Sequence, residues 1–294
     1  MKILITGGNG FIARNLFEGL NGEYALVSRS SAELDLLDSR EVFEYIKGNR
    51  FDVIIHTATY DAAPKHSAKD PAKVMENNLK MFFNLVRCND RFGRMIYYGS
   101  GAEFKRENWI PKMKEDYFDR YVPQDQYGFS KYIMNKYTQL STNIYNLRLF
   151  AVFGKYEDWR VRFISNACCR AALGLPITVN QNVFFDYMYI DDLINITKWF
   201  IENAPHEKTY NICTARAFSH LELARKVSEI SGKNPEIIIK DRGAGIEYSG
   251  DNSRLMDEIG GYDFKDMDSS IEELYNWYSA NKFSIDKEKL LACG

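Results

Sequence analysis

The first fifteen residues constrain the fold more than any other part of the chain. An apolar run, Lys2–Thr6, leads directly into glycines spaced as Gly7-x-x-Gly10-x-x-Ala13, and a helix-like pattern follows. This stretch predicts a strand, a tight turn and the start of a helix. A glycine turn with free N–H groups at a helix N-terminus suits the pyrophosphate of a dinucleotide. The same spacing of three residues also occurs in ordinary turns before a helix, so other parts of the sequence are needed to distinguish a dinucleotide-binding turn from an ordinary one.

Composition excludes several classes of partner. The 294 residues are enough for a large core, and 38 Lys and Arg against 40 Asp and Glu leave a net charge of −2. Because basic residues are not in excess over acidic ones, neither nucleic acid nor an anionic membrane surface is an expected partner. No apolar stretch reaches the ~18 residues of a membrane span, and no charged-then-apolar leader precedes the first strand, so we expect a cytoplasmic protein.

The cysteines argue against a disulfide framework and against a zinc site. They are odd in number, scattered, and lack C-x-x-C or partnering histidine spacing. Their positions are Cys88, Cys168, Cys169, Cys213 and Cys293. We therefore expect a reducing compartment and a functional site without metal.

Apolar, β-rich runs alternate with helical periodicity along most of the chain. This alternation predicts an α/β fold of the Rossmann type, a doubly wound parallel sheet, together with a smaller, interleaved substrate-binding lobe. The expected strands of the main sheet are Lys2–Thr6, Tyr24–Ser28, Val53–His56, Met95–Gly99 and Tyr145–Phe150.

Two later segments break this alternation and indicate the second lobe. Lys155–Asn180 is rich in Arg and small residues, and Ser231–Tyr262 is interrupted by glycines and charges. Between them, Phe184–Ala204 followed by Tyr210–Cys213 is expected to return to the main sheet as strand, helix and strand. The expected division is residues 1–154 and 184–214 for the dinucleotide-binding domain, and residues 155–183 and 215–294 for the substrate-binding lobe.

The end of the second expected strand bears on the cofactor. A Rossmann fold places there the group that meets the adenosine ribose, and NAD sites use Asp or Glu for it. This chain has Arg29 beside hydroxyl residues, which suits a 2′-phosphate and favours NADP(H), with NAD(H) as the alternative. Asp35 offers an acceptor for the adenine amino group and Leu36 a side chain to cover the ring. A solvated Arg29 and an acidic helix start are the competing interpretations.

Ser100, Tyr127 and Lys131 form the expected catalytic constellation. Ser100 ends the fourth expected strand, and Tyr127 follows 27 residues later. Tyr127 and Lys131 are four residues apart, so on a helix they share a face, and the ammonium is expected to lower the pKa of the phenol. The phenol then exchanges a proton with a carbonyl oxygen that Ser100 also hydrogen-bonds, and Lys131 holds the nicotinamide ribose. The pattern predicts hydride transfer.

The tyrosine–lysine spacing alone is not specific, because the chain contains it more than once. Tyr132 lies five positions after Tyr127, about 140° round a helix of ~3.6 residues per turn, so the two cannot face one site. Tyr127 follows Pro123 closely and has small neighbours that leave room for a ligand, so context favours it. The pairs with this spacing are Tyr127/Lys131, Tyr132/Lys136 and Tyr278/Lys282.

Short segments spread over the chain together resemble a known family. They are Thr6–Ala13, Val53–His56, Glu76–Asn78, Gly99–Ser100, Tyr127–Lys131, Arg148–Phe150, Phe153–Gly154 and Asp186–Asp192. Across essentially its full length the chain resembles the extended short-chain dehydrogenase/reductase family of nucleotide-sugar epimerases, dehydratases and reductases, and Ser28–Arg40 is most similar to its GDP-L-fucose synthase-like 4-keto reductases. The resemblance implies that Arg29 meets NADP and that the triad is catalytic. The cofactor site then comprises Gly7, Gly10, Phe11, Ile12, Arg29, Asp35, Leu36, Tyr127 and Lys131.

The chain departs from the family where chemistry depends on particular side chains. The 4,6-dehydratases carry adjacent Asp and Glu after the catalytic hydroxyl residue, whereas this chain has Gly101 and Ala102. Dehydration therefore lacks its acid–base pair. GDP-L-fucose synthase epimerises its substrate with a Cys at the position of Ala102 and a His in the next lobe. The corresponding segment Lys155–Asn166 contains no His.

Nucleotide recognition is also expected to differ from that of the family. The diphosphate-binding Arg of the family corresponds to Phe185 here, and the Asn that follows Arg-x-Phe corresponds to Ala151. Arg160, Arg162 and Arg254 are the remaining cationic candidates. Of these we expect Arg162 and Arg254 to contact substrate together with Ser100.

Together these features predict an NADPH-dependent reductase. We expect it to reduce the 4-keto group of a nucleotide-linked (6-deoxy)hexose, without epimerisation, in the synthesis of a surface polysaccharide precursor. The alternatives are an NAD-dependent nucleotide-sugar 4-epimerase, which uses the same triad, and a non-catalytic NADP-binding protein of the same fold. The expected partners are a nucleotide sugar and, as an option, a second copy of the chain in a homodimer.

Overall fold

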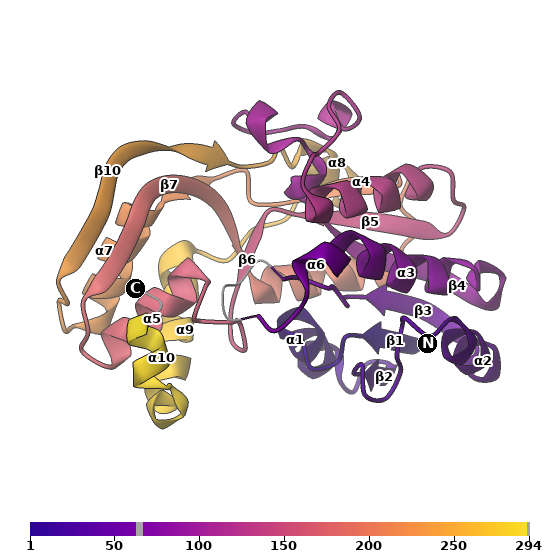
Figure 1. Ribbon diagram of the computed structural model, residues 1–294, viewed down its shortest axis with the longest axis horizontal. Helices are drawn as coiled ribbons and strands as arrows, with labels where there is room; N and C mark the ends of the chain where they lie inside the picture. The colour runs from indigo at the N-terminus through magenta and orange to yellow at the C-terminus, as the bar shows by residue number, and fades with distance from the viewer. Residues whose placement is uncertain (63–66, 293–294) are drawn as a thin grey trace.

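A parallel sheet of six strands forms the centre of one lobe in residues 1–62 and 67–292, which the computed structural model describes (Figure 1). The strand order is β2-β1-β3-β4-β5-β8, and every neighbouring pair is parallel. The order reverses direction at β1, which makes the crevice between β1 and β3 a topological switch point where ligands bind. The strands are β1 (Lys2–Thr6), β2 (Ala25–Arg29), β3 (Phe51–His56), β4 (Phe92–Ser100), β5 (Ile144–Leu149) and β8 (Thr209–Ile212).

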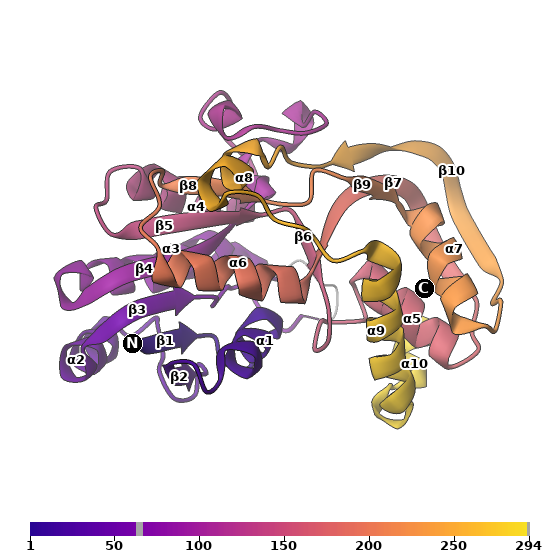
Figure 2. The same ribbon diagram turned by 180° about the vertical axis from the view of Figure 1, so that it is seen from behind.

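Helices cover both faces of this main sheet, as Figures 1 and 2 show. Alternate residues of β1 point to opposite faces, so Ile3 and Ile5 join one apolar cluster and Leu4 another. The first cluster includes residues of α1 (Phe11–Leu20) and α6 (Ile190–Glu202). The second includes residues of α2 (Ser39–Asn49), α3 (Val74–Val86) and α4 (Gln126–Thr138).

The second lobe is built round a smaller sheet with the order β10-β7-β6, and β9 pairs antiparallel with β7. Its helices lie against one side of the long, curved pair β7 and β10 (Figure 1). The strands are β6 (Ala151–Phe153), β7 (Ile177–Tyr189), β9 (Ala217–Ser219) and β10 (Ile237–Tyr248). The helices of this lobe are α5 (Phe163–Ala172), α7 (His220–Ser231), α9 (Met267–Ala280) and α10 (Lys287–Ala292), whereas α8 (Ser253–Ile259) packs beside β8 of the main sheet (Figure 2).

One apolar core joins the two lobes. The cluster that begins under β1 continues through Phe200 of α6 and Met188 of β7 into α5, α7 and α9 of the second lobe. Each of these buried side chains removes apolar surface from water, at about 25 cal/mol per Å². The lobes therefore pack as one body, and the strand ends of the main sheet keep a fixed relation to the second lobe.

The expected strands of the main sheet are present, with ends that differ by up to three residues. One expectation about Phe184–Ala204 is wrong. Its helical part is α6, on the main sheet, but its strand part belongs to β7, which pairs with β10 and β6 in the second sheet. The reason is long-range pairing, because β7 finds its partner about sixty residues further along the chain.

Three further features of the described residues concern the cysteines, groups of possible metal ligands and possible membrane spans. Cys88, Cys168, Cys169 and Cys213 are buried free thiols, and Cys293 lies outside the described residues. Within the described ranges, no group of three or more His, Cys, Asp or Glu side chains is placed to hold a metal ion. None of the helices in those ranges is long and apolar enough to span a bilayer.

Candidate active site

The turn between β1 and α1 lies at the switch point and suits the pyrophosphate of a dinucleotide. Gly7 has φ +70°, and a Cβ there would lie 2.9 Å from the Cα of Ala58, so only glycine fits. Gly10 forms the N-terminal boundary of α1 without any side-chain cap, and Phe11 and Ile12 begin the helix. The first N–H groups of α1 thus remain available to an anion. The close approach and the donors both fit the predicted cofactor.

Arg29 ends β2, as expected, but a carboxylate accompanies it. Its Nε donates to the Tyr45 hydroxyl at 2.9 Å, and its Nη1 lies 3.7 Å from Oε1 of Glu33. Hydrogen bonds from the main chain and side chain of Ser30 lower the pKa of Glu33. The end of β2 therefore offers a cation for a 2′-phosphate and an anionic acceptor for a 2′-hydroxyl.

Of the two residues expected at the adenine, only Asp35 lies at the surface. Its Oδ1 accepts a hydrogen bond from the Leu37 N–H at 2.9 Å. Leu36 is only 5% exposed and packs in the cluster beneath α2, whereas Leu37 is 37% exposed. The structure thus places Leu36 in the core, because the two adjacent leucines point to opposite sides of the segment.

Ser100, Tyr127 and Lys131 come together at the carboxyl edge of the sheet. Ser100 ends β4, and Tyr127 lies in the first turn of α4, whose N-terminus Asp125 caps by accepting from the Gly128 N–H at 2.8 Å. The Ser100 hydroxyl lies close enough to the Tyr127 hydroxyl to lower the pKa of the phenol. The Lys131 ammonium lies 5.8 Å from the centroid of the Tyr127 ring.

The pKa values of Tyr127 and Lys131 differ from the expectation. Burial raises the pKa of Tyr127 to about 12; Asp61 also raises it, while the Ser100 hydrogen bond and Arg162 lower it. The predicted lowering by Lys131 is therefore wrong for the protein alone, because Lys131 is directed at the main-chain carbonyl of Tyr98, 2.9 Å away. Burial lowers the pKa of Lys131 to about 8. At neutral pH the phenol carries its proton and the amine its charge.

Tyr248, at the end of β10, is a second phenol at Ser100, which the sequence analysis missed. A Cβ added at Gly101 would lie 2.3 Å from its hydroxyl, and the Ser100 side chain acts on its pKa. Its ring packs in an aromatic cluster that contains Phe185, at a centroid distance of 5.3 Å. The position where the family has a cation is thus filled by stacked rings. No local sequence signal pointed to Tyr248, since it lies 148 residues after Ser100.

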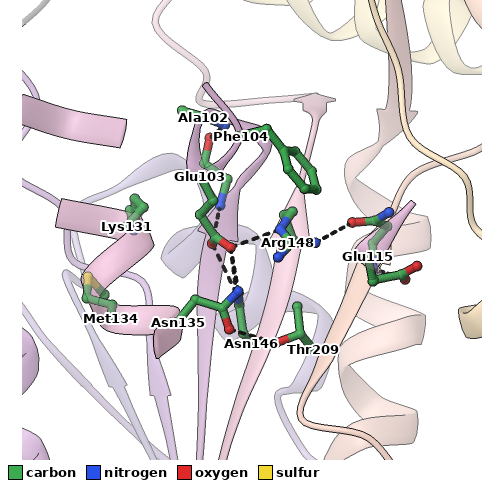
Figure 3. Close-up of polar contacts among 12 residues, drawn as sticks. Ala102, Glu103, Phe104, Glu115, Lys131, Met134, Asn135, Asn146, Arg148 and Thr209 are labelled. Atoms are coloured by element: carbon green, nitrogen blue, oxygen red, sulfur yellow. Dashed lines mark hydrogen bonds and ion pairs between the residues drawn. The ribbon is translucent and has the colours of Figure 1, made fainter. Parts of the chain in front are cut away.

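A second missed residue is Glu103, in the short 3-10 turn Gly101–Glu103 that follows Ser100. Its side chain is fully buried and accepts from the Ser100 N–H at 3.2 Å and from Asn135 Nδ2 at 2.8 Å. It also accepts from Arg148 Nε at 2.9 Å and from Asn146 Nδ2 at 3.0 Å (Figure 3). The carboxylate therefore joins the Ser100 turn to α4 and β5.

The arginines expected at the substrate have different surroundings. Arg162 immediately precedes α5, and its charge acts on Tyr127 and on Glu157. Arg254 donates to the Thr209 carbonyl at 3.2 Å and lies 3.9 Å from Glu115. It lines a surface cavity that does not include the triad, with Lys114, Glu115, Asp116, His206, Glu207, Asp251, Ser253, Asp257 and Glu258. The charge of Arg162 is thus felt by Tyr127 of the triad, whereas Arg254 lines a separate cavity.

The tyrosines of the other two tyrosine–lysine pairs make contacts that serve the structure of the protein. Tyr132 and Lys136 both bond to the carboxylate of Asp119, the latter at 2.8 Å. Tyr278 is 2% exposed and belongs to the core that joins the lobes. Neither tyrosine lies at the Ser100 turn.

A family model described as the NAD dependent epimerase/dehydratase family matches residues 3–213. The chain belongs to this family. The match spans the cofactor turn, the triad and every strand of the main sheet, and it ends directly after β8. The protein is therefore an NAD(P)-dependent enzyme of the nucleotide-sugar epimerase, reductase and dehydratase family.

Relatives of this epimerase/dehydratase-family enzyme include reductases and epimerases. It is 26% identical to the GDP-6-deoxy-D-talose 4-dehydrogenase of Aggregatibacter actinomycetemcomitans, covering 94% of this chain and 97% of the relative. It shares its fold with the NADP-bound GDP-mannoheptose C4 reductase of Campylobacter jejuni, at TM-score 0.82, 20% identity and coverage of 94% and 98%. It also resembles the UDP-glucose 4-epimerase of Thermus thermophilus in complex with NAD, at TM-score 0.79, 21% identity and coverage of 94% and 98%.

Proposed function

We propose that the enzyme uses NADPH to reduce the 4-keto group of a nucleotide-linked hexose or 6-deoxyhexose, in the cytoplasm, and so supplies an activated sugar for a surface polysaccharide. The observation that carries the proposal is the meeting of Ser100, at the end of β4, with Tyr127 in the first turn of α4, where the Ser100 hydroxyl lowers the pKa of the phenol. It sets two hydroxyls at the carboxyl edge of the sheet, where one carbonyl oxygen can meet both. The bound cofactor supplies the hydride.

The protein residues then handle the oxygen and its proton. Tyr127 is protonated at neutral pH, with a pKa of about 12, which suits the donation of a proton to a carbonyl oxygen that becomes an alcohol. Ser100 stabilises the same oxygen through a hydrogen bond as negative charge develops. Lys131 of α4 is anchored to β4 through the Tyr98 carbonyl, and its ammonium would hold the nicotinamide ribose of the bound cofactor.

Retention of the neighbouring stereocentres follows from the groups near Ser100. Epimerisation at C3 or C5 needs a base to remove a carbon-bound proton and an acid to return one from the other face. Ala102 has no titratable group, and burial raises the pKa of the nearby Tyr248 well above its usual value. Neither residue is a base at neutral pH, which supports simple reduction.

An absorbance assay tests the proposal. A panel of 4-keto nucleotide sugars, with different bases and sugars, is incubated with the enzyme and NADPH, and the nicotinamide band is followed. We expect oxidation of NADPH with at least one 4-keto substrate and none with the corresponding 4-hydroxy sugars. Absence of oxidation across the panel, with NADPH binding intact, contradicts the proposal.

A second candidate is an NAD-dependent nucleotide-sugar 4-epimerase, and Glu33 is the observation that favours it. Its carboxylate lies at the end of β2, where an acceptor for the 2′-hydroxyl of NAD belongs, and its pKa is lowered by Ser30. An epimerase retains its cofactor through the reaction cycle. Purified protein that carries tightly bound NAD and interconverts 4-hydroxy epimers without added cofactor supports this candidate.

A further inference from the structure

We propose that Glu103 is a positioning residue of this active site: its buried carboxylate fixes Ser100 against the helix that carries Tyr127 and Lys131, and it places a negative charge at the lysine-bearing face of that helix. The inference rests on the triad that the proposed function uses. It concerns the free enzyme, however, so it can be tested without a substrate.

The positioning part follows from the hydrogen bonds of the carboxylate. Glu103 Oε1 accepts from the main-chain N–H of Ser100, and Glu103 Oε2 accepts from Asn135 Nδ2. Asn135 lies one helical turn after Lys131 on α4, and so on the same face. One buried side chain therefore bridges the Ser100 turn and the lysine-bearing face of α4. Its loss lets the two move relative to each other.

The electrostatic part follows from the groups that surround Lys131. His56 from β3 is buried, with a pKa lowered to about 3, and is neutral. Tyr127 from α4 is protonated, and Tyr98 from β4 presents only its carbonyl. The Glu103 carboxylate, joined to the lysine-bearing face of α4 through Asn135, favours the ammonium of Lys131 against the cost of burial.

The Glu103–Arg148 pair is poorly suited to a purely stabilising role. Both side chains are fully buried, and Arg148 Nη2 is a buried donor without a partner. A buried ion pair with an unsatisfied donor often stabilises less than an apolar pair of similar volume. The chain nonetheless places this pair directly beside the catalytic turn. Removing both charges together should therefore be tolerated better than removing one.

The test follows the titration of Lys131 in the full-length protein. Protein labelled with 13C-lysine is titrated by NMR, and the Lys131 resonance is assigned by its loss in Lys131→Arg. In Glu103→Gln we expect the midpoint for Lys131 to fall by about half a pH unit or more. The pH above which NADPH affinity declines should fall with it, since both depend on the ammonium.

A matched control is Glu115→Gln. Glu115 is also a buried carboxyl near Arg148, and it accepts from the Asn211 N–H at 2.8 Å, but it bonds neither Ser100 nor Asn135. We expect no shift for Lys131 in this variant. Equal shifts in Glu115→Gln and Glu103→Gln, or no shift in either, overturn the proposal.

A double variant covers the case in which Glu103→Gln does not fold. Glu103→Gln combined with Arg148→Met removes both buried charges and leaves none unpaired. The Lys131 midpoint should fall in this variant as well. If both variants fail to fold, Glu103 acts as an essential core element and the proposal is wrong. If the Lys131 shift is found but no 4-keto sugar is reduced, the proposed function fails and this inference stands.

Discussion

The Lys131 ammonium donates to the main-chain carbonyl of Tyr98, 2.9 Å away, rather than to the hydroxyl of Tyr127. The lysine is thus anchored by β4, whose last residue is Ser100. The Tyr127 phenol in turn lies by the Ser100 hydroxyl, which lowers its pKa, and is partly shielded from solvent. In the protein alone, Lys131 of α4 is therefore anchored to the strand that ends at Ser100 and does not hydrogen-bond the phenol, so the roles of the three residues can be separated by substitution.

Tyr127→Phe should abolish most of the turnover and leave cofactor binding nearly unchanged, because it removes only the proton donor. General acid catalysis contributes typically ~10²–10⁴-fold to a rate. Steady-state rates and NADPH titrations measure the two effects. Tyr132→Phe is the matched control, since Tyr132 has the same spacing to a lysine but bonds to Asp119. A Tyr127→Phe enzyme with full turnover shows that the assignment is wrong.

Arg29→Ala should weaken the binding of NADPH and affect NADH little. Losing a charged hydrogen bond to the 2′-phosphate costs on the order of 1.5–3 kcal/mol, roughly ten- to a hundredfold in Kd. Glu33, left without its cation, should then favour NADH further. Fluorescence titrations with both cofactors measure this, with Arg40→Ala on the exposed start of α2 as the control. Equal losses for the two cofactors mean that Arg29 is structural.

Incubation of the enzyme with its 4-keto substrate in D₂O, without reduced cofactor, should leave C3 and C5 free of deuterium. The reason is the absence of a base at Ala102, combined with the protonated Tyr248. Mass spectrometry or proton NMR of the recovered sugar gives the answer. Incorporation clearly above a sample without enzyme shows that the protein epimerises its substrate.

Glu157 should make stability fall as the pH rises. Burial raises the pKa of this carboxyl to about 7 from its ordinary 4.5, and Ser165 donates to it at 2.6 Å. The folded state therefore binds the proton more tightly than the unfolded state, so this stabilisation is complete below about pH 4.5 and is lost as the pH rises through 7.

Glu157→Gln removes this dependence. Between pH 5 and pH 8 the variant should gain about 2–3 kcal/mol relative to the wild type. Urea denaturation at the two pH values measures the difference. Glu107→Gln on the surface should produce no comparable change. A pH-independent difference between Glu157→Gln and the wild type contradicts the prediction.

Much of the dinucleotide lobe could be predicted because its signals are local. The apolar run of β1, the glycine turn and the spacing of Tyr127 and Lys131 each lie within a few residues, where periodicity determines which side chains share a face. The order of Ser100 and Tyr127 along the chain then places them at neighbouring strand and helix ends. Their contact in the structure follows from the parallel topology of the sheet.

The remaining features depend on contacts that periodicity does not encode. Whether Leu36 or Leu37 faces the core depends on how the segment before α2 approaches the sheet. The pairing of β7 with β10 and the arrival of Tyr248 at Ser100 depend on strands far apart in sequence. The raised pKa of Tyr127 depends on its burial, which the neighbouring residues in the chain do not reveal.

The family match ends at residue 213, but the active site does not. A fragment cut after Cys213 would keep the glycine turn, the triad and all strands of the main sheet, yet would lose the phenol that β10 brings to Ser100. The groups that meet at Ser100 are thus drawn from both sides of the point where the family match ends. Substitutions after residue 213 can therefore change the surroundings of Ser100 through β10, while the glycine turn, Tyr127 and Lys131 stay the same.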